Sequence, residues 1–254
     1  MENNRDSFGS NFGFIMAAVG SAVGLGNIWG FPYKISAYGG FAFLLVYLAL
    51  GIFVGLAVMV GEFVIGRKTG LSPIAAYRKL SKKFTWLGYM AVICPFLVLC
   101  FYFVLGGMVM RYAAGYLTAI FGWDTWGVSN IADFFGSFIM NGGQMILWTA
   151  IFIVLNVAIV AGGIGEGIEK FCKVGMPALF VMLIIIIIYV ACQPGAGEGY
   201  KFIFGWDLSP LKEDWLLVLK SAAGQMFFSL SLGMGAMITY GSYLQKKELS
   251  LIHI

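Results

Sequence analysis

The sequence predicts an all-α integral membrane protein. Of its 254 residues, 60% are hydrophobic and only 11% are charged, whereas soluble domains carry roughly 25% charged residues. The apolar residues form long runs and lack the in-out alternation of a membrane β-barrel, so the spans are helices. Two of these runs are interrupted by glycines, which indicates helices that are broken within the membrane.

Six spans are expected. They cover, in order, residues 11–37, 41–66, 84–117, 144–161, 168–192 and 215–244, after a polar cytoplasmic tail at residues 1–10. With the links between them they form one transmembrane domain, residues 11–248. The tail lacks a basic, cleavable leader sequence, so we expect the first span itself to direct insertion into the plasma membrane.

The first three spans have distinct signatures. The first is apolar but has a glycine-rich interruption between Val23 and Gly26. The second follows a Tyr-Gly-Gly turn and carries one carboxylate, Glu62. The third is uncharged over residues 84–110, which is long enough to cross the ~30 Å of hydrocarbon in a bilayer.

The last three spans are separated by a short turn and a polar loop. The fourth is a plain apolar run, and we expect the glycine-rich residues 162–167 to form the turn before the fifth. This stretch follows no predicted strand and lacks the Lys-Ser/Thr of a phosphate loop, so it does not indicate nucleotide binding. The sixth span is broken at residues 229–235, where serines and glycines gather.

The distribution of basic residues predicts the orientation. With the N-terminus in the cytoplasm, most of the 16 Lys and Arg residues face inward, including the cluster within residues 67–83. That asymmetry follows the positive-inside rule, and the opposite orientation would violate it. The basic link is therefore a topology signal, and we expect the lipid bilayer as a partner and no nucleic acid.

The two broken spans occupy corresponding positions if five spans form one repeat and the sixth begins a second. Paired glycine-interrupted spans are the best sequence indication of a binding site at the membrane midplane of an inverted-repeat transporter. The expected fold class is therefore an inverted-repeat transporter fold with broken helices 1 and 6, represented here by the first five-helix repeat and helix 6 only.

Several ordered motifs resemble those of the neurotransmitter:sodium symporter family. They are the run Ser21–Tyr33, Glu62 followed by Gly66-Arg67, the segment Gly167–Lys170 and the segment Gln225–Gly235. The resemblance covers nearly the whole chain and implies sodium-coupled symport of an amino acid into the cell by alternating access. It also implies further spans, so we expect this chain to be an incomplete fragment. No set of residues supports an enzyme.

The glycine-rich break is the expected substrate site. Gly24, Leu25 and Gly26 could present backbone N–H groups to an anion at the positive end of a half-helix, although these glycines could instead only permit close helix packing. The resemblance implies that the anion is the carboxylate of an amino acid. Relatives that transport amines carry an aspartate at the position of Gly24, so glycine here favours an amino acid.

The resemblance also implies the remaining substrate-binding residues. They are Ala22, Val98, Tyr102, Phe228, Ser229, Ser231 and Met234. Methionine is adaptable and leaves more room than an aromatic ring, so we expect a fairly large, apolar amino-acid side chain. An aromatic residue such as Tyr102 could otherwise serve only to pack an apolar helix.

Sodium is the expected co-transported ion. The resemblance implies one site formed by the Ala22 carbonyl and the side chains of Asn27 and Ser229, and a second that uses the carbonyls of Gly20 and Val23. Hard cations take oxygen ligands, which unwound backbone supplies. For Ser229, a hydrogen bond to a preceding carbonyl is the alternative. The sequence leaves chloride dependence open.

Gating or supporting roles are implied for Arg5, Phe8, Lys34, Glu62 and Gln225. Glu62 should brace the two broken helices, and the alternative is a proton-coupling carboxylate. Gly30 stands where the family has its outer-gate arginine. Because Lys34 lies four residues further on the same helical face, we hypothesise that it supplies the missing cation. Arg5 and Phe8 match the inner gate.

Two other functions stay open from the residues: a proton-coupled amino-acid transporter of the same fold, and a non-functional fragment or helical interaction module. Residues 249–254 depart from the family pattern and resemble the translation of a sequencing adapter. We expect this tail to be non-native, and His253 is given no role. The oligomeric state is not indicated.

Overall fold

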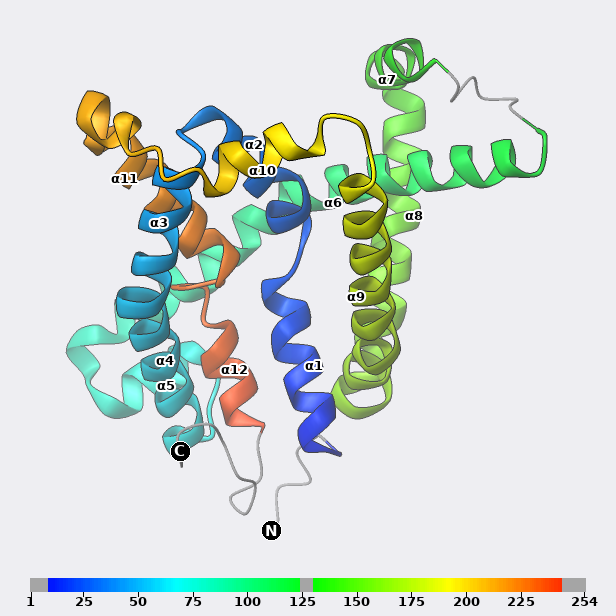
Figure 1. The fold of residues 1–254 in the computed structure, drawn as a ribbon. Coiled ribbons are helices and arrows are strands. Elements are labelled where there is room, and N and C mark those ends of the chain that lie inside the picture. Colours follow the sequence, from blue (N-terminus) through cyan, green and yellow to red (C-terminus); the bar gives the residue numbers. More distant parts are fainter. Residues whose placement is uncertain (1–8, 124–129, 244–254) are drawn as a thin grey trace. The chain divides into compact units, whose positions relative to one another are not determined.

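The computed structural model describes residues 9–123 and 130–243. Every regular element in these residues is a helix (Figure 1), which confirms the predicted all-α class. The chain divides into two compact units, residues 1–92 with 164–254 and residues 93–163, and each is described by itself. Arg5, Phe8 and the tail at residues 249–254 lie outside the described residues.

The helices follow one another along the chain with short links. The first half contains α1 (Asn11–Ala22), η1 (Gly26–Gly30), α2 (Phe31–Ala37), α3 (Phe41–Leu50), η2 (Gly51–Gly55), α4 (Leu56–Thr69), α5 (Pro73–Leu80), η3 (Lys82–Phe84) and α6 (Thr85–Ile120). The second half contains α7 (Ile131–Met140), α8 (Gly142–Ala161), η4 (Gly163–Glu169), α9 (Lys170–Ala191), α10 (Ala196–Phe204), α11 (Ser209–Ser229) and α12 (Ala236–Ser242). Of the η elements, η3 is a 3-10 turn and the others are π-helical.

The first span is broken where its glycines indicate. Ser10 caps α1, because its side chain accepts a 3.0 Å hydrogen bond from the N–H of Gly13. The helix ends at Val23, whose backbone is extended (φ −89°, ψ 104°). The chain then re-enters helix in η1 and α2, which are bent by 52° from α1.

Four uninterrupted helical segments are long and apolar enough to cross a membrane: Phe41–Thr69, Lys82–Ile120, Gly142–Ala161 and Gly163–Ala191. The bent pair of the first span adds a fifth. The expected sixth span contains no such segment within the described residues. The 21-residue α11 is long enough but carries Lys212, Glu213, Asp214 and Lys220, residues 230–235 are unwound, and α12 has only 7 residues.

Several links differ from the expected ones. The loop expected over residues 118–143 contains α7, because Phe134 and Phe138 recur on one face and are both buried. Residues 162–167, expected as a turn, instead belong largely to the π-helical η4, which runs directly into α9. The sixth span begins earlier, at Ser209, but Asp214 has a non-helical backbone (φ −149°, ψ 75°) that separates this first turn from the rest.

A buried core joins the second half of the first span and the first half of the sixth span to α3. Its centre is Ile35 of α2, Phe43 of α3, and Val218 and Ala222 of α11. Aromatic rings from α2 and α3 pack around it, and those of Phe31 and Tyr47, for example, have centroids 4.9 Å apart. Burial of these apolar surfaces holds α2 and α11 on the same neighbour, so the helices on one side of each break are fixed relative to each other.

The second half of the sixth span, α12, packs directly on α4. A Cβ on Gly66 would overlap the carbonyl of Ile238, and a Cβ on Gly241 would lie 2.7 Å from the carbonyl of Phe63. Small residues of this kind let helix backbones approach closely in a membrane. The two glycines therefore fix α12 against α4.

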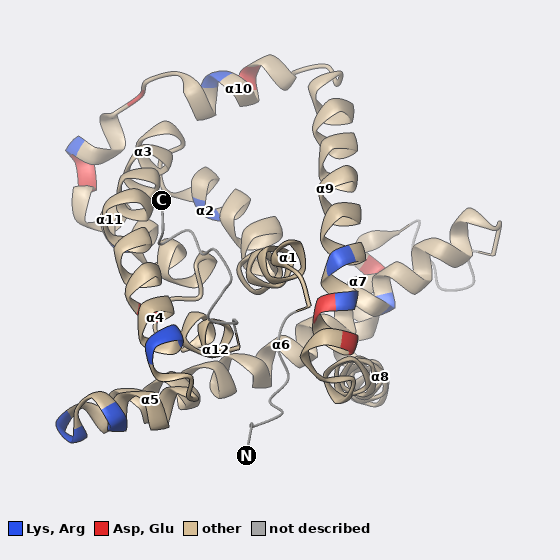
Figure 2. Ribbon diagram, turned by 90° about the horizontal axis from the view of Figure 1, so that it is seen from below, with Lys and Arg blue, Asp and Glu red and all other residues tan. Residues whose placement is uncertain are grey.

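Basic residues gather at one end of the first unit. Arg67 and Lys68 lie in the last turn of α4, and Arg78 and Lys79 lie in α5 (Figure 2). The first turn of α1 lies at the same end (Figure 1). This arrangement agrees with a cytoplasmic basic link, and the orientation of the N-terminus stays a prediction.

In the second unit, a close backbone contact and cation–π contacts hold α6, α7 and α8 together. Gly107 of α6 lies against the backbone of α8, where a Cβ would be 2.6 Å from the nitrogen of Thr149. The guanidinium carbon of Arg111 lies 4.9 Å from the ring centroid of Phe134 and 5.9 Å from that of Trp148. These cation–π contacts attach α7 to the pair formed by α6 and α8.

The close contact between α4 and α12 predicts an asymmetry between two glycines of α4. Gly66→Ala should destabilise the folded protein by about 1–3 kcal/mol, because the new methyl group overlaps the backbone of α12. Gly61→Ala is the matched control, since no atom lies within 4 Å of its Cβ position. Thermal unfolding of the detergent-solubilised protein measures both. Equal midpoints for the two variants would contradict the contact.

Candidate functional site

Two hydrogen bonds join the two broken spans beside their breaks. The hydroxyl of Ser231, in the sixth span, donates a 2.9 Å hydrogen bond to the carbonyl oxygen of Ser21, near the end of α1. Nε2 of Gln225, in α11, donates a 3.0 Å hydrogen bond to the carbonyl oxygen of Gly26 in η1. Each half of the first span is thus hydrogen-bonded to the sixth.

The backbone of the first break begins a new helix. The carbonyl of Gly24 accepts hydrogen bonds from the N–H groups of Asn27 at 3.0 Å and Ile28 at 3.1 Å. N–H groups in the first turn of a helix have no acceptor within that helix, and they lie at the positive end of its dipole. Gly24 and Leu25 therefore lie where a backbone binds an anion.

Gly26 and Phe228 are in direct contact. A Cβ on Gly26 would overlap Cε1 and Cδ1 of the Phe228 ring. The ring therefore covers the start of η1, and two of the expected substrate-binding residues meet. Close packing, the alternative considered for the glycines, is also present at Gly26.

Three of the expected sodium ligands lie at the breaks. Nδ2 of Asn27 donates a hydrogen bond to the carbonyl oxygen of Ala22, so the side-chain amide spans the first break. Ser229 is 4% exposed, and its hydroxyl oxygen accepts a 3.0 Å hydrogen bond from Nε2 of Gln225. Within the described part of the chain, Ser229 makes no hydrogen bond to a preceding carbonyl, which was the alternative.

Gln225 connects these groups. Its side chain is almost fully buried, at 1% exposure, and the same Nε2 atom serves both the carbonyl of Gly26 and the hydroxyl of Ser229. A buried amide that donates twice fixes both acceptors relative to each other. Gln225 therefore positions the second break against the start of η1.

The second break is a strained turn. Ser231 has a positive φ of 52°, in the left-handed region that side chains other than glycine rarely adopt. Residues held in this way cluster at functional sites. Met234, half-buried, lies between Gly233 (φ 76°) and Gly235 (φ 65°).

Glu62 supports the second break from α4. It is 7% exposed, and its Oε1 accepts a 2.7 Å hydrogen bond from the N–H of Gly233. The N–H of Met237, in the first turn of α12, also interacts with the carboxylate. Oε2 is buried and makes no hydrogen bond within the described residues. Glu62 was expected to brace both broken helices, but within the described residues its hydrogen bond is to the sixth span and not to the first.

Gly20, expected in the second sodium site, packs against α9. A Cβ there would lie 3.3 Å from both Sγ of Cys172 and Sδ of Met176. Val23, its expected partner, is the extended residue that ends α1. Both carbonyls therefore belong to the last turn of α1 and the break that follows it.

The remaining expected residues belong to α2, α6 and the N-terminal tail. Val98 and Tyr102 lie one turn apart on α6, within the second unit. Lys34 is half-buried in the last turn of α2 and makes no ion pair among the described residues. The Cβ position of Gly30 lies 3.9 Å from Oε1 of Gln225. Arg5 and Phe8 lie outside the described residues.

Sequence reasoning missed Glu169. This residue is the last of η4 and is only 2% exposed, and its carboxylate holds the start of α1. The available signal was an acidic residue at the edge of a long apolar run, because ionisable groups in membrane segments are functional candidates by default.

The sequence is similar to known proteins. The model of the sodium:neurotransmitter symporter family matches residues 5–135 and 135–251. The uncharacterized sodium-dependent transporter YhdH of Bacillus subtilis (strain 168) is 38% identical over 253 residues, which are 97% of this chain and 54% of that protein. The sodium- and chloride-dependent taurine transporter of Rattus norvegicus is 27% identical over 285 residues, 96% of this chain and 45% of that protein. The chain spans about half the length of the curated relatives it matches.

A solved structure is also similar. It is the crystal structure of MhsT in complex with L-phenylalanine, which matches with a TM-score of 0.86 and 42% sequence identity over 96% of this chain and 55% of that chain. The likeness confirms the inverted-repeat transporter fold with broken first and sixth helices, and the named relatives are transporters and not enzymes. Because the family model covers nearly all of the sequence, the chain belongs to the sodium:neurotransmitter symporter family.

Proposed function

We propose that the protein carrying this chain is a sodium-coupled symporter that imports an amino acid with an apolar side chain by alternating access about the two broken helices. The observation that carries the proposal is the hydrogen-bonded junction of the breaks, Ser231 to Ser21 and Gln225 to Gly26. Broken helices that meet in a membrane provide both N–H groups and carbonyls to a bound zwitterion and its cation.

The substrate carboxylate would bind at the start of η1. Gly24 and Leu25 immediately precede that helix, and its positive end favours an anion. A glycine at position 24 brings no competing carboxylate. An amino acid therefore fits this end better than an amine that lacks its own negative charge.

Sodium would bind between the carbonyl of Ala22 and the side chains of Asn27 and Ser229. Asn27 already lies within hydrogen-bond distance of the Ala22 carbonyl, and turning its side-chain amide by a half-turn would present an oxygen in place of Nδ2. With the substrate carboxylate as a further ligand, each of the two solutes would complete the site of the other. The second sodium would use the carbonyls of Gly20 and Val23.

The substrate side chain would lie among Phe228, Ser231 and Met234, with Val98 and Tyr102 contributed by the third span. Methionine is flexible, so the pocket can accept a large apolar group. MhsT has been solved with L-phenylalanine, which supports an aromatic or large aliphatic amino acid as the first ligand to test.

The two ends of the pathway would be controlled by separate groups. We infer that Lys34 supplies a cation at the outer end, where Gly30 offers no side chain. Arg5 and Phe8 would serve the inner gate, Glu62 and Gln225 would support the breaks, and the N-terminus would lie in the cytoplasm with the protein in the plasma membrane. Chloride dependence is left to experiment.

Loss of the Ser229 hydroxyl tests the sodium site. Ser229→Ala should raise the sodium concentration that gives half-maximal binding of L-phenylalanine by about tenfold, equivalent to ~1.4 kcal/mol. Binding of radiolabelled L-phenylalanine to the purified full-length protein measures it. Ser242→Ala is the control, because that hydroxyl bonds only locally, to the carbonyl of Thr239 at 2.7 Å. Binding that ignores sodium but follows pH would instead favour a proton-coupled transporter.

A carboxylate at position 24 tests where the substrate's negative charge lies. Gly24→Asp should weaken L-phenylalanine binding by at least about tenfold more than Gly24→Asn, since like charges ~4 Å apart repel by ~4 kcal/mol near a protein surface. Phenethylamine, which lacks the carboxylate, should bind Gly24→Asp better than Gly24→Asn. Equal affinities of the two variants for L-phenylalanine would place the substrate carboxylate elsewhere.

Removal of the positive charge of Lys34 tests its proposed role at the outer end of the pathway. Lys34→Gln should reduce sodium-driven uptake of L-phenylalanine into proteoliposomes several-fold, because closure of the outer end would lack its positive charge. Lys212→Gln removes an exposed lysine of α11 and serves as the control. Uptake and sodium dependence that match the unaltered protein would rule out this role for Lys34.

A further inference from the structure

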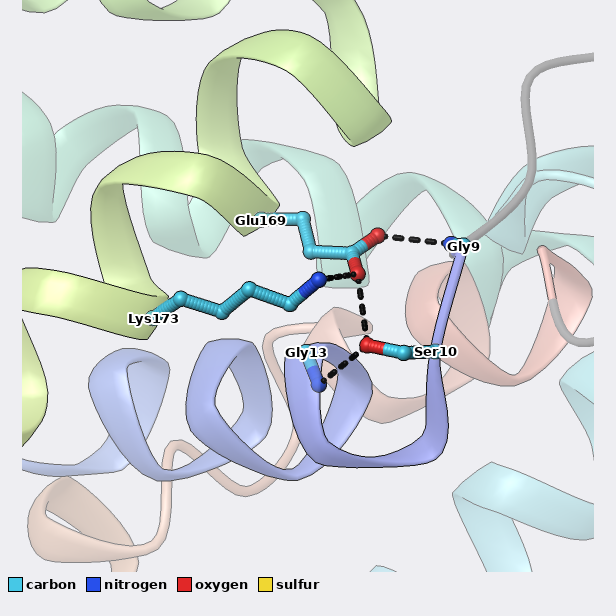
Figure 3. A network of polar contacts seen from close by, with 5 residues as sticks. All are labelled: Gly9, Ser10, Gly13, Glu169 and Lys173. Atoms are coloured by element: carbon cyan, nitrogen blue, oxygen red, sulfur yellow. Dashed lines mark hydrogen bonds and ion pairs between the residues drawn. The ribbon is translucent and has the colours of Figure 1, made fainter.

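A buried carboxylate connects the start of α1 to the start of α9 (Figure 3). Glu169 is the last residue of η4 and is 2% exposed. Its side chain points toward the residues that begin α1, and Lys173 approaches the same carboxylate from the next turn of α9. The expected substrate and sodium sites do not use this group.

Three donors converge on this carboxylate. The backbone N–H of Gly9 donates to Oε2 at 2.7 Å, the hydroxyl of Ser10 donates to Oε1 at 2.9 Å, and Nζ of Lys173 lies 2.7 Å from Oε1. Ser10 in turn accepts from the N–H of Gly13 at 3.0 Å and so caps α1. The cap of α1 and the carboxylate of Glu169 are therefore parts of one network.

The contact is close as well as polar. A Cβ on Gly13 would overlap Oε1, Cδ and Cγ of Glu169, so only glycine lets the carboxylate reach the first turn of α1. Further along, the Cβ position of Gly20 lies 3.3 Å from Sγ of Cys172. Separation of α1 from α9 would break the network at one end and further expose Cys172, which is partly buried, at the other.

We propose that Glu169 is a positioning residue that holds α1 closed against α9, and that its hydrogen bonds to Gly9 and Ser10 must break when α1 moves away to open the inner side. This inference rests on the proposed alternating access about the broken helices, because the break after Ala22 allows α1 to move separately from the rest of its span. The exchange involves no covalent step. It replaces hydrogen bonds within the protein by hydrogen bonds to water.

Glu169→Gln is the most conservative test. The amide keeps the length and shape of the side chain but replaces one acceptor oxygen with a donor, so one of the three donors faces another donor. Glu166→Gln is the matched control. It changes the same residue type in the same helical segment, where Glu166 is 87% exposed and pairs only with an exposed Lys170 at 3.7 Å.

Cys172 is a built-in reporter. With every other cysteine of the protein changed to serine, Cys94, Cys100 and Cys192 of this chain among them, Cys172 is the only thiol, and its labelling by a water-soluble maleimide reports how often α1 leaves α9. In the full-length protein without sodium or substrate, Glu169→Gln should label about tenfold faster, the change expected when one charge-assisted hydrogen bond is lost. Glu166→Gln should stay within about twofold of the parent.

Sodium distinguishes opening from unfolding. Added sodium with L-phenylalanine should slow labelling of both the parent and Glu169→Gln, whereas an unfolded protein would label quickly under all conditions. If labelling of Glu169→Gln is faster without sodium but sodium protects neither protein, Glu169 holds α1 and the proposed sodium coupling fails. If sodium protects both proteins but their rates without sodium are equal, the role of Glu169 is overturned.

Ser10→Ala provides a second variant in case Glu169→Gln does not yield a monodisperse protein. It removes one of the three donors and should raise the labelling rate of Cys172 about threefold, with the protection by sodium retained. A rate equal to that of the parent would overturn the proposal.

Discussion

The structure depends on the need to satisfy backbone groups that two broken helices expose in an apolar setting. Hydrocarbon offers no hydrogen bonds, so unwound backbone within a membrane must be bonded by protein, ligand or water. Here each break contributes to the other, through Ser231 to the carbonyl of Ser21 and through Gln225 to the carbonyl of Gly26. In the proposed function, a small zwitterion and its cation bind to backbone groups at these breaks.

Buried polar side chains extend this principle to the surrounding helices. Gln225, Glu62 and Glu169 each come from a regular helical segment and bond to backbone groups at or before a broken helix. An orphaned polar group is costly in such surroundings, so each pairing specifies one arrangement of its helix. The helices that carry the breaks are thus held at their ends and near the breaks. Any movement of these helices would have to break these specific hydrogen bonds.

The sequence was sufficient for the class of fold and for both breaks, because long apolar runs and glycine clusters are local signals. The partners of the breaks were not local. That Gln225 reaches Gly26, or that Glu169 reaches Gly9, depends on contacts between residues 199 and 160 positions apart. Glu169 and Lys173 have the i, i+4 spacing of an ordinary helical ion pair, so the sequence did not indicate that Glu169 also bonds to α1. The helix α7 was not predicted because the link between the third and fourth spans is rich in Gly, Trp and Asp.

The most direct test of the central claim is an experimental structure of the full-length protein with sodium and L-phenylalanine. We predict that the carboxylate of the ligand lies within hydrogen-bond distance of the N–H groups at Gly24 and Leu25, and that a sodium ion contacts Asn27 and Ser229. Unbroken helices through residues 22–27 and 229–235, or a ligand bound away from both segments, would contradict the account.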